Sequence, residues 1–228
     1  MVIQDTVYYI IGVTVAMALL LVFVNYKLRH YDPLSKPKGI VLAVIMAFQM
    51  LIDLVRSKTN DDLTDKLTPY IATAGLYIFM SNIAGLFSLE PPTSNFSVTL
   101  TLAAITCILI EVCSAKSRGA GGYIRSWFEP FAPFVVINIV SKVSTLASLS
   151  LRLFGNIISG SILMSMIYKL LAVVSGAITP FLGDFNIVGV IVAPVLHFYF
   201  DLFAGAMQTY IFVILSISFI GKELPHED

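Results

Sequence analysis

The segment FAPFVVINIVSKVSTLASLSLRLFGNIISGSILMSMIYKLLAVV, at residues 131–174, decides the fold class of this chain. Almost every residue in it is apolar or small. A helix rises about 1.5 Å per residue, so one helix of this length is over twice as long as the roughly 30 Å hydrocarbon core of a bilayer. We therefore expect a membrane helix that is steeply tilted or broken.

The composition of the whole chain also points to the membrane. Of 228 residues, 57% are hydrophobic and 12% are charged, whereas soluble domains carry about 25% charged residues. The mean hydropathy is +0.89. These values exclude a soluble globular enzyme. The 14 basic and 14 acidic residues give zero net charge, and without a basic excess we expect no nucleic-acid partner.

The remaining segments predict a single all-α, polytopic membrane domain. Residues 40–55 are shorter and carry Gln49 and Asp53, which favours an amphipathic helix on the inner membrane surface. Residues 7–24 are expected to be a retained helix rather than a signal peptide, because acidic Asp5 precedes them and no A-x-A-like site follows. The five predicted membrane-embedded helices are residues 7–24, 70–89, 97–115, 131–174 and 187–220, the last with a kink at Pro194.

Basic residues gather on one side of this predicted topology, which places the N-terminus outside and the C-terminus in the cytoplasm. A bacterial-type cell membrane is the expected location, with an organellar inner membrane as the alternative. Eleven of the 14 basic residues fall in inner segments: Lys27, Arg29, Lys36, Lys38, Arg56, Lys58, Lys66, Lys116, Arg118, Arg125 and Lys222.

Charges inside membrane helices usually mark an ion path or a partner, because each costs several kcal/mol. Glu111 is expected to lie at the membrane interface. Lys142 and Lys169 are expected to extend their ammonium groups to the membrane surface, and Asp184 is a possible partner of Lys169. Arg152 and Asp201 lie too deep for that explanation. Arg152 shares one helix face with polar residues of the same segment. That polar stripe consists of Asn138, Ser141, Thr145, Ser148, Arg152, Asn156 and Ser159.

Small and hydroxyl residues can also mark a helix–helix interface. The arginine and two asparagines in the stripe favour a different interpretation, a water-accessible path through half of the membrane that ends near a fixed positive charge. A second polar line, of His197, Asp201 and Gln208, follows the last segment. There His197 can share a proton with Asp201, although a purely structural pair of Asp201 with Arg152 is an alternative.

The sequence suggests no metal site and no cofactor. Cys107 and Cys113 are six residues apart in an apolar run and read as small buried hydrophobes. A phosphate-binding glycine loop is absent from the sequence, so nucleotide chemistry is not expected in this chain.

The run SLSLRLFGN at residues 148–156 closely resembles the signature of the a subunit of F-type ATP synthase, and it includes the arginine of that signature. Two further regions resemble the same family. The first contains Asn82, Gly85-Leu86, Pro92-Thr93-Ser94 and Thr99, and the second contains Gln208 followed by Ile211-Phe212. The resemblance covers essentially the whole chain.

The resemblance implies a stator channel whose two long tilted helices lie against a rotating ring of c subunits, with the b-subunit stalk and the rest of the complex as further partners. Arg152 would face the ring carboxylate and separate two half-channels, with Gly155 and Asn156 supporting it. The outer path would contain Asn82, Ser161, His197, Asp201 and Gln208, and the inner path Asn138, Ser141, Thr145 and Ser148. The resemblance is compatible with either H⁺ or Na⁺ as the coupling ion.

The sequence departs from common family patterns at four places. Ser161 stands where an ionisable residue often follows the arginine by nine positions, and Asn138 where a carboxylate often precedes it by fourteen. Asp201 replaces a histidine or glutamate, and Thr145-Leu146 replaces a proline. A secondary transporter with an Arg152/Asp201 substrate site and a non-transporting scaffold are the competing hypotheses.

Overall fold

The fold is described by a computed structural model that covers residues 5–31, 37–59, 61–87, 89–128, 131, 133–178 and 186–223. These residues form helices and connections, and no strand occurs among them. The helices are α1 (Asp5–Arg29), α2 (Ile40–Arg56), α3 (Asp61–Ile83), α4 (Phe96–Ser126), α5 (Phe134–Ile178), α6 (Ile187–His197) and α7 (Gly205–Glu223).

Five segments in the described part of the chain are long and apolar enough to cross a membrane. They are Thr6–Arg29, Leu63–Phe87, Phe96–Gly119, Phe134–Ala177 and Ile187–Glu223. The prediction of an all-α polytopic membrane protein is confirmed. The helix bounds, however, differ from the predicted apolar stretches: α3 begins at Asp61 and ends at Ile83, where a short 3-10 helix, Ala84–Phe87, follows, and α4 continues to Ser126. Hydropathy marks the part of a helix that lies in lipid, whereas the backbone hydrogen-bond ladder can continue into water.

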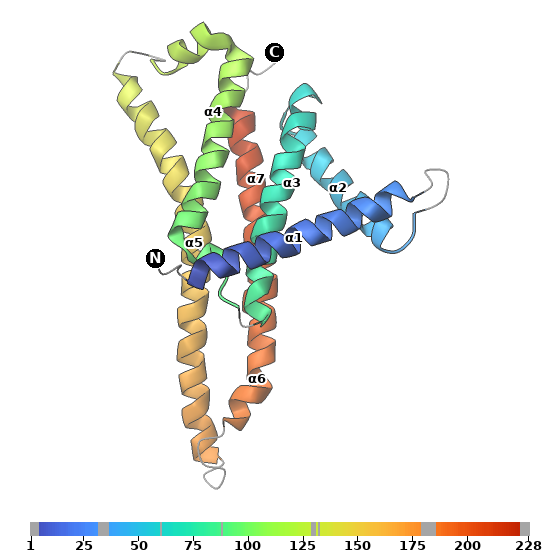
Figure 1. The fold of residues 1–228 in the computed structure, drawn as a ribbon. Coiled ribbons are helices and arrows are strands. Elements are labelled where there is room, and N and C mark those ends of the chain that lie inside the picture. Colours follow the sequence, from blue (N-terminus) through green and yellow to red (C-terminus); the bar gives the residue numbers. More distant parts are fainter. Residues whose placement is uncertain are drawn as a thin grey trace.

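The long segment that decides the fold class is one continuous helix. α5 contains 45 residues and is neither broken nor interrupted. In Figure 1, α3, α4 and α7 lie together beside one half of α5, while α6 accompanies its other half as a long hairpin. α1 runs across the other long helices at a steep angle (Figure 1).

Apolar contacts between α2, α3, α4, α5 and α7 hold these helices in place. Leu149 and Leu153 of α5 are each 1% exposed and pack with Ile78 of α3 and Phe212 of α7. Because Leu149 and Leu153 are one turn apart, they fix which face of α5 turns inward. A second cluster joins α2, α3, α4 and α7: Val55, Leu67, Ile71, Ile110, Cys113, Val213, Ile217 and Ile220.

The C-terminal segment contains a wide π-helical turn, Phe198–Ala204, between α6 and α7. Pro194 lies inside α6, and the α-helical hydrogen-bond pattern changes only after His197. Asp201 stands within this wide turn. Single π-turns occur frequently at functional sites, because they reposition side chains that a regular helix would place elsewhere.

Candidate functional site

Arg152 stands on the outward face of α5. Its Nη2 donates a hydrogen bond to Ser148 Oγ, one turn earlier, at 3.4 Å. The buried neighbours Leu149 and Leu153 hold the helix in the rotation that exposes Arg152. Gly155 leaves open space beside this face, since a Cβ built on it would meet no atom within 4 Å. A guanidinium stays charged at any relevant pH, so this face needs a polar partner if it lies within a membrane.

A first cavity of about 610 Å³, called here the Asp201 cavity, opens beyond Arg152 between α3, α5 and the π-turn. It brings together four of the predicted outer-path residues, which come from distant parts of the sequence. The lining includes Asn82, Asn156, Ser159, Ser161, His197 and Asp201. Gln208 does not line the cavity but accepts a hydrogen bond from Asn156 Nδ2 through its Oε1 at 3.3 Å.

A continuous chain of hydrogen bonds runs through the Asp201 cavity. Asp201 Oδ2 lies 2.6 Å from His197 Nδ1, and His197 Nε2 lies 2.6 Å from the Tyr168 hydroxyl. Both ring nitrogens of His197 are therefore engaged, with the proton positions set by the tautomer. Sequence reasoning missed Tyr168, although it follows Ser161 by two helical turns and shares its face. No ion pair among the described residues joins Asp201 to Arg152, so the alternative of a structural Arg152–Asp201 pair is not what the structure shows.

Two glycines allow α3 and the short 3-10 helix after it, Ala84–Phe87, to approach the π-turn closely. A Cβ on Gly85 would lie 3.1 Å from Asp201 Cγ, and a Cβ on Gly205 would lie 2.7 Å from Asn82 Cβ. Asn82 Nδ2 donates to the Gly205 carbonyl at 3.2 Å. The backbone of the C-terminal segment is thus in direct contact with Asn82, which fixes one wall of the cavity.

We expect Gly205→Ala to lower the stability of the complex, because the new methyl group overlaps Asn82. Forcing an extra methyl into a packed site costs about 1–3 kcal/mol, which thermal unfolding of the purified complex would register as a lower Tm. Gly160→Ala is the matched control, since Gly160 lines the same cavity but has open space around it. Equal Tm values for the two variants would contradict the close contact.

A second cavity of about 690 Å³, called here the Glu111 cavity, lies on the other side of Arg152. It is bounded by the C-terminal part of α4, by α5 and by α7. Two predicted inner-path residues, Ser141 and Thr145, line it. The other two do not: Asn138 Nδ2 donates to the Trp127 carbonyl at 2.9 Å, and Ser148 contacts Arg152.

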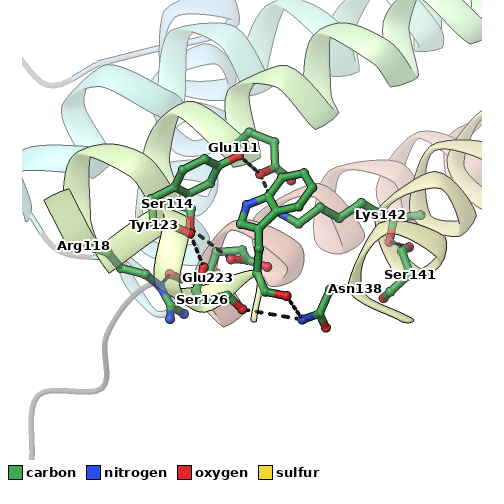
Figure 2. Close-up of polar contacts among 11 residues, drawn as sticks. Glu111, Ser114, Arg118, Tyr123, Ser126, Asn138, Ser141, Lys142 and Glu223 are labelled. Carbon is green, nitrogen blue, oxygen red and sulfur yellow. Dashed lines mark hydrogen bonds and ion pairs between the residues drawn. The ribbon is translucent and has the colours of Figure 1, made fainter. Parts of the chain in front are cut away.

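Three helices contribute polar groups to this second cavity and its surroundings (Figure 2). Glu111 of α4 forms an ion pair with Lys142 of α5 and accepts a hydrogen bond from the Tyr123 hydroxyl at 2.7 Å. Glu223 of α7 accepts a hydrogen bond from Ser114 at 3.0 Å. Burial and then the nearby Glu111 raise the pKa of Tyr123, so this hydroxyl remains a hydrogen-bond donor.

Sequence reasoning treated Glu111 and Lys142 separately, one as interfacial and one as snorkelling, and so missed their pairing. The two residues are 31 positions apart and lie on different helices, so their spacing in the sequence does not indicate that they pair. The proposed partner of Lys169, Asp184, lies outside the described residues. Cys107 and Cys113 are both free thiols.

Arg152 stands between the two cavities along α5. The Glu111 cavity is lined by α5 residues up to Leu146, and the Asp201 cavity by α5 residues from Asn156 onward. At about 1.5 Å per residue these two limits are roughly 15 Å apart on the helix axis. The geometry therefore provides two separate cavities, each with polar side chains in a largely apolar lining, and a permanent positive charge between them.

Comparison with known proteins gives a consistent result over nearly the whole chain. The family model described as ATP synthase A chain matches residues 7–221. The chain is similar to ATP synthase subunit a of Desulforamulus reducens, with 28% identity over 93% of this chain and 78% of the relative. It is also 31% identical to ATP synthase subunit a of Mycoplasma genitalium, over 93% of this chain and 78% of the relative. For the same subunit of Streptococcus agalactiae, identity is 30% over 83% of this chain and 79% of the relative.

Proposed function

Because the chain belongs to the ATP synthase A chain family, the a subunits of F-type ATP synthases, we propose that it provides two offset half-channels that lead ions to and from a rotating c-ring. Membership of the family makes the chain a multi-pass component of the membrane sector of that complex.

The Asp201 cavity is the outer half-channel in this proposal. Ions from outside enter among Tyr168, His197 and Asp201, whose hydrogen bonds connect the cavity lining. Carboxylate and imidazole groups can both bind and release protons near neutral pH when their surroundings favour it. Asn82, Ser161 and Gln208 complete the polar environment, and Asn156 connects Gln208 to the cavity.

Arg152 separates the half-channels and faces the c-ring. Its outward, exposed position leaves the guanidinium available to a carboxylate on a partner subunit. An opposite charge at short range favours the ionised form of a carboxyl group, so each ring site would lose its ion on reaching Arg152. The same positive charge repels a cation that would pass directly from one half-channel to the other.

The Glu111 cavity is the inner half-channel, entered from the ring near Ser141 and Thr145. The expected orientation places the N-terminus outside and the C-terminus in the cytoplasm, because that arrangement collects basic residues on the inner side. The c-ring and the b-subunit stalk are the proposed direct partners. The observation that carries the proposal is the exposed Arg152 on one uninterrupted helix, between two cavities that each contain polar side chains.

Reconstitution of the complete complex into vesicles tests this function against a secondary transporter. We expect an imposed ion gradient to drive ATP synthesis only when this chain is present in the complex. The chain reconstituted alone, without the ring, should transport neither ions nor solutes. Flux through the isolated chain that depends on Arg152 would overturn the proposal in favour of a transporter.

A further inference from the structure

The Glu111 cavity contains a charged pair in a position where a membrane protein rarely tolerates one. Glu111 of α4 and Lys142 of α5 both lie in segments that are long and apolar enough to cross a membrane. Their side chains are 30% and 27% exposed, so each remains partly accessible from the cavity. Neither residue belongs to the polar stripe of α5 that marks the proposed inner path.

A backbone reversal in α4 builds the surroundings of this pair. Gly119 has φ 72° and ψ 161°, a conformation that residues with a Cβ rarely adopt. The chain beyond it folds back toward the start of α5, at the top of Figure 1. Asn138 fastens this segment by donating to the Trp127 carbonyl at 2.9 Å. The reversal therefore brings Tyr123 and Trp127 over the cavity.

Two aromatic rings hold Lys142 beside Glu111. The Lys142 ammonium lies 4.5 Å from the centroid of the Trp127 ring and 5.3 Å from that of Tyr123. Cation–π contacts of this kind stabilise a cation by about 0.5–2 kcal/mol, depending on solvation. Lys142 thus stays in place whether Glu111 is ionised or neutral, while the Tyr123 hydroxyl donates to Glu111 (Figure 2).

We propose that Glu111 is the last protein group to bind the coupling ion, a proton, before it leaves the inner half-channel, and that Lys142 and Tyr123 position it. This inference rests on the proposed function. A proton released from the ring passes by water to the Glu111 carboxylate and weakens its ion pair with Lys142. The proton then leaves to water on the inner side, the ion pair re-forms, and only O–H bonds have been made and broken.

The other titratable or charged groups around the cavity are Cys107 of α4, Tyr123, and Lys222 and Glu223 of α7. Glu223 is the competing acid, but its carboxylate accepts a hydrogen bond from Ser114 and the structure records no basic partner for that side chain among the described residues. Lys222 stands over the Phe219 ring, 5.7 Å from its centroid. Only Glu111 combines a carboxylate, a fixed cation and cavity access.

The test uses inside-out vesicles that hold the complete complex, so that the inner face meets the bulk medium. We expect Glu111→Gln to slow gradient-driven ATP synthesis by about 10-fold to 100-fold, at or below the lower end of what a positioned proton-transfer group contributes. Added small weak acids in the medium should restore much of the rate, because they replace the missing carboxylate as proton acceptors. Glu223→Gln removes an equal charge from the same cavity. It should neither slow ATP synthesis nor make the rate depend on added weak acids.

Lys142→Gln provides an independent check if Glu111→Gln fails to assemble. Loss of the cation removes the ion-pair partner of the Glu111 carboxylate, so proton release to the inner side should slow and its dependence on the pH of the medium should change. A normal rate for Glu111→Gln, a loss that weak acids do not restore, or a larger effect of Glu223→Gln would each overturn the inference. Arg152→Ala, measured in parallel, separates the two proposals: full coupling in that variant contradicts the half-channel function itself.

Discussion

Arg152→Ala should abolish ion-driven ATP synthesis while the complex still assembles. Assembly should survive because the guanidinium is exposed and its recorded hydrogen bond is to Ser148 on the same helix, so its removal leaves no buried group unpaired. The expected loss in rate is at least about 100-fold, the scale found when one pre-organised charge-stabilising group is removed from a site. Synthesis is measured after an imposed ion gradient in vesicles.

Passive ion movement provides the second readout for the same variant. Without the positive charge, ions can cross between the Asp201 and Glu111 cavities, so we expect the vesicles to lose their gradient faster than wild type. Lys169→Ala is the matched control, because Lys169 is another exposed cation on α5. If the vesicles lost their ion gradient equally fast with both variants, removal of any cation from α5 would explain the effect. That result would contradict a specific role for Arg152.

Asp201→Asn should produce the second largest effect. An amide cannot take up and release a proton, so coupled flux should fall by about 100-fold, the lower range for a positioned proton-transfer group. His197 then remains as the titratable partner within the hydrogen-bonded chain. Because the remaining titratable partner is an imidazole rather than a carboxylate, the dependence of the residual flux on outer pH should change. The measurement is the rate of ATP synthesis as a function of outer pH.

Tyr199→Phe is the control for the Asp201 cavity. Tyr199 lines the same cavity and stacks on Phe203, with ring centroids 5.6 Å apart. Its hydroxyl has no part in the proposed path, so the flux and its pH dependence should stay at wild-type values. If Asp201→Asn also left both unchanged, Asp201 would have no role in ion transfer.

The membrane fold and the position of Arg152 could be predicted from sequence, because both depend on local patterns. Apolar length marks the spans, and helical periodicity places the polar residues of α5 on one face. The same patterns could not predict where α3 begins. Residues 61–69 are largely polar, and only tertiary packing shows that they continue the helix into α3.

The contacts that build the two cavities depend on events that sequence periodicity does not encode. Tyr168 and His197 are 29 positions apart and meet because α5 and α6 form a hairpin. Glu111 meets Lys142 because α4 packs against α5, and it meets Tyr123 because α4 is kinked at Gly119. The π-turn at Asp201 packs against α3 and Gly85, which are distant from it in the sequence. Sequence patterns therefore locate the charged residues, whereas the structure shows which residues contact them.

Side-specific labelling of two single cysteines would test the central claim, two half-channels separated by Arg152, most directly. In a complex whose Cys107 and Cys113 are replaced by alanine, Ser161→Cys reports the Asp201 cavity and Ser141→Cys the Glu111 cavity. A membrane-impermeant thiol reagent should modify the Ser161→Cys variant from outside only and the Ser141→Cys variant from inside only. Reaction of both cysteines from the same side, or of either cysteine from both sides, would contradict the account.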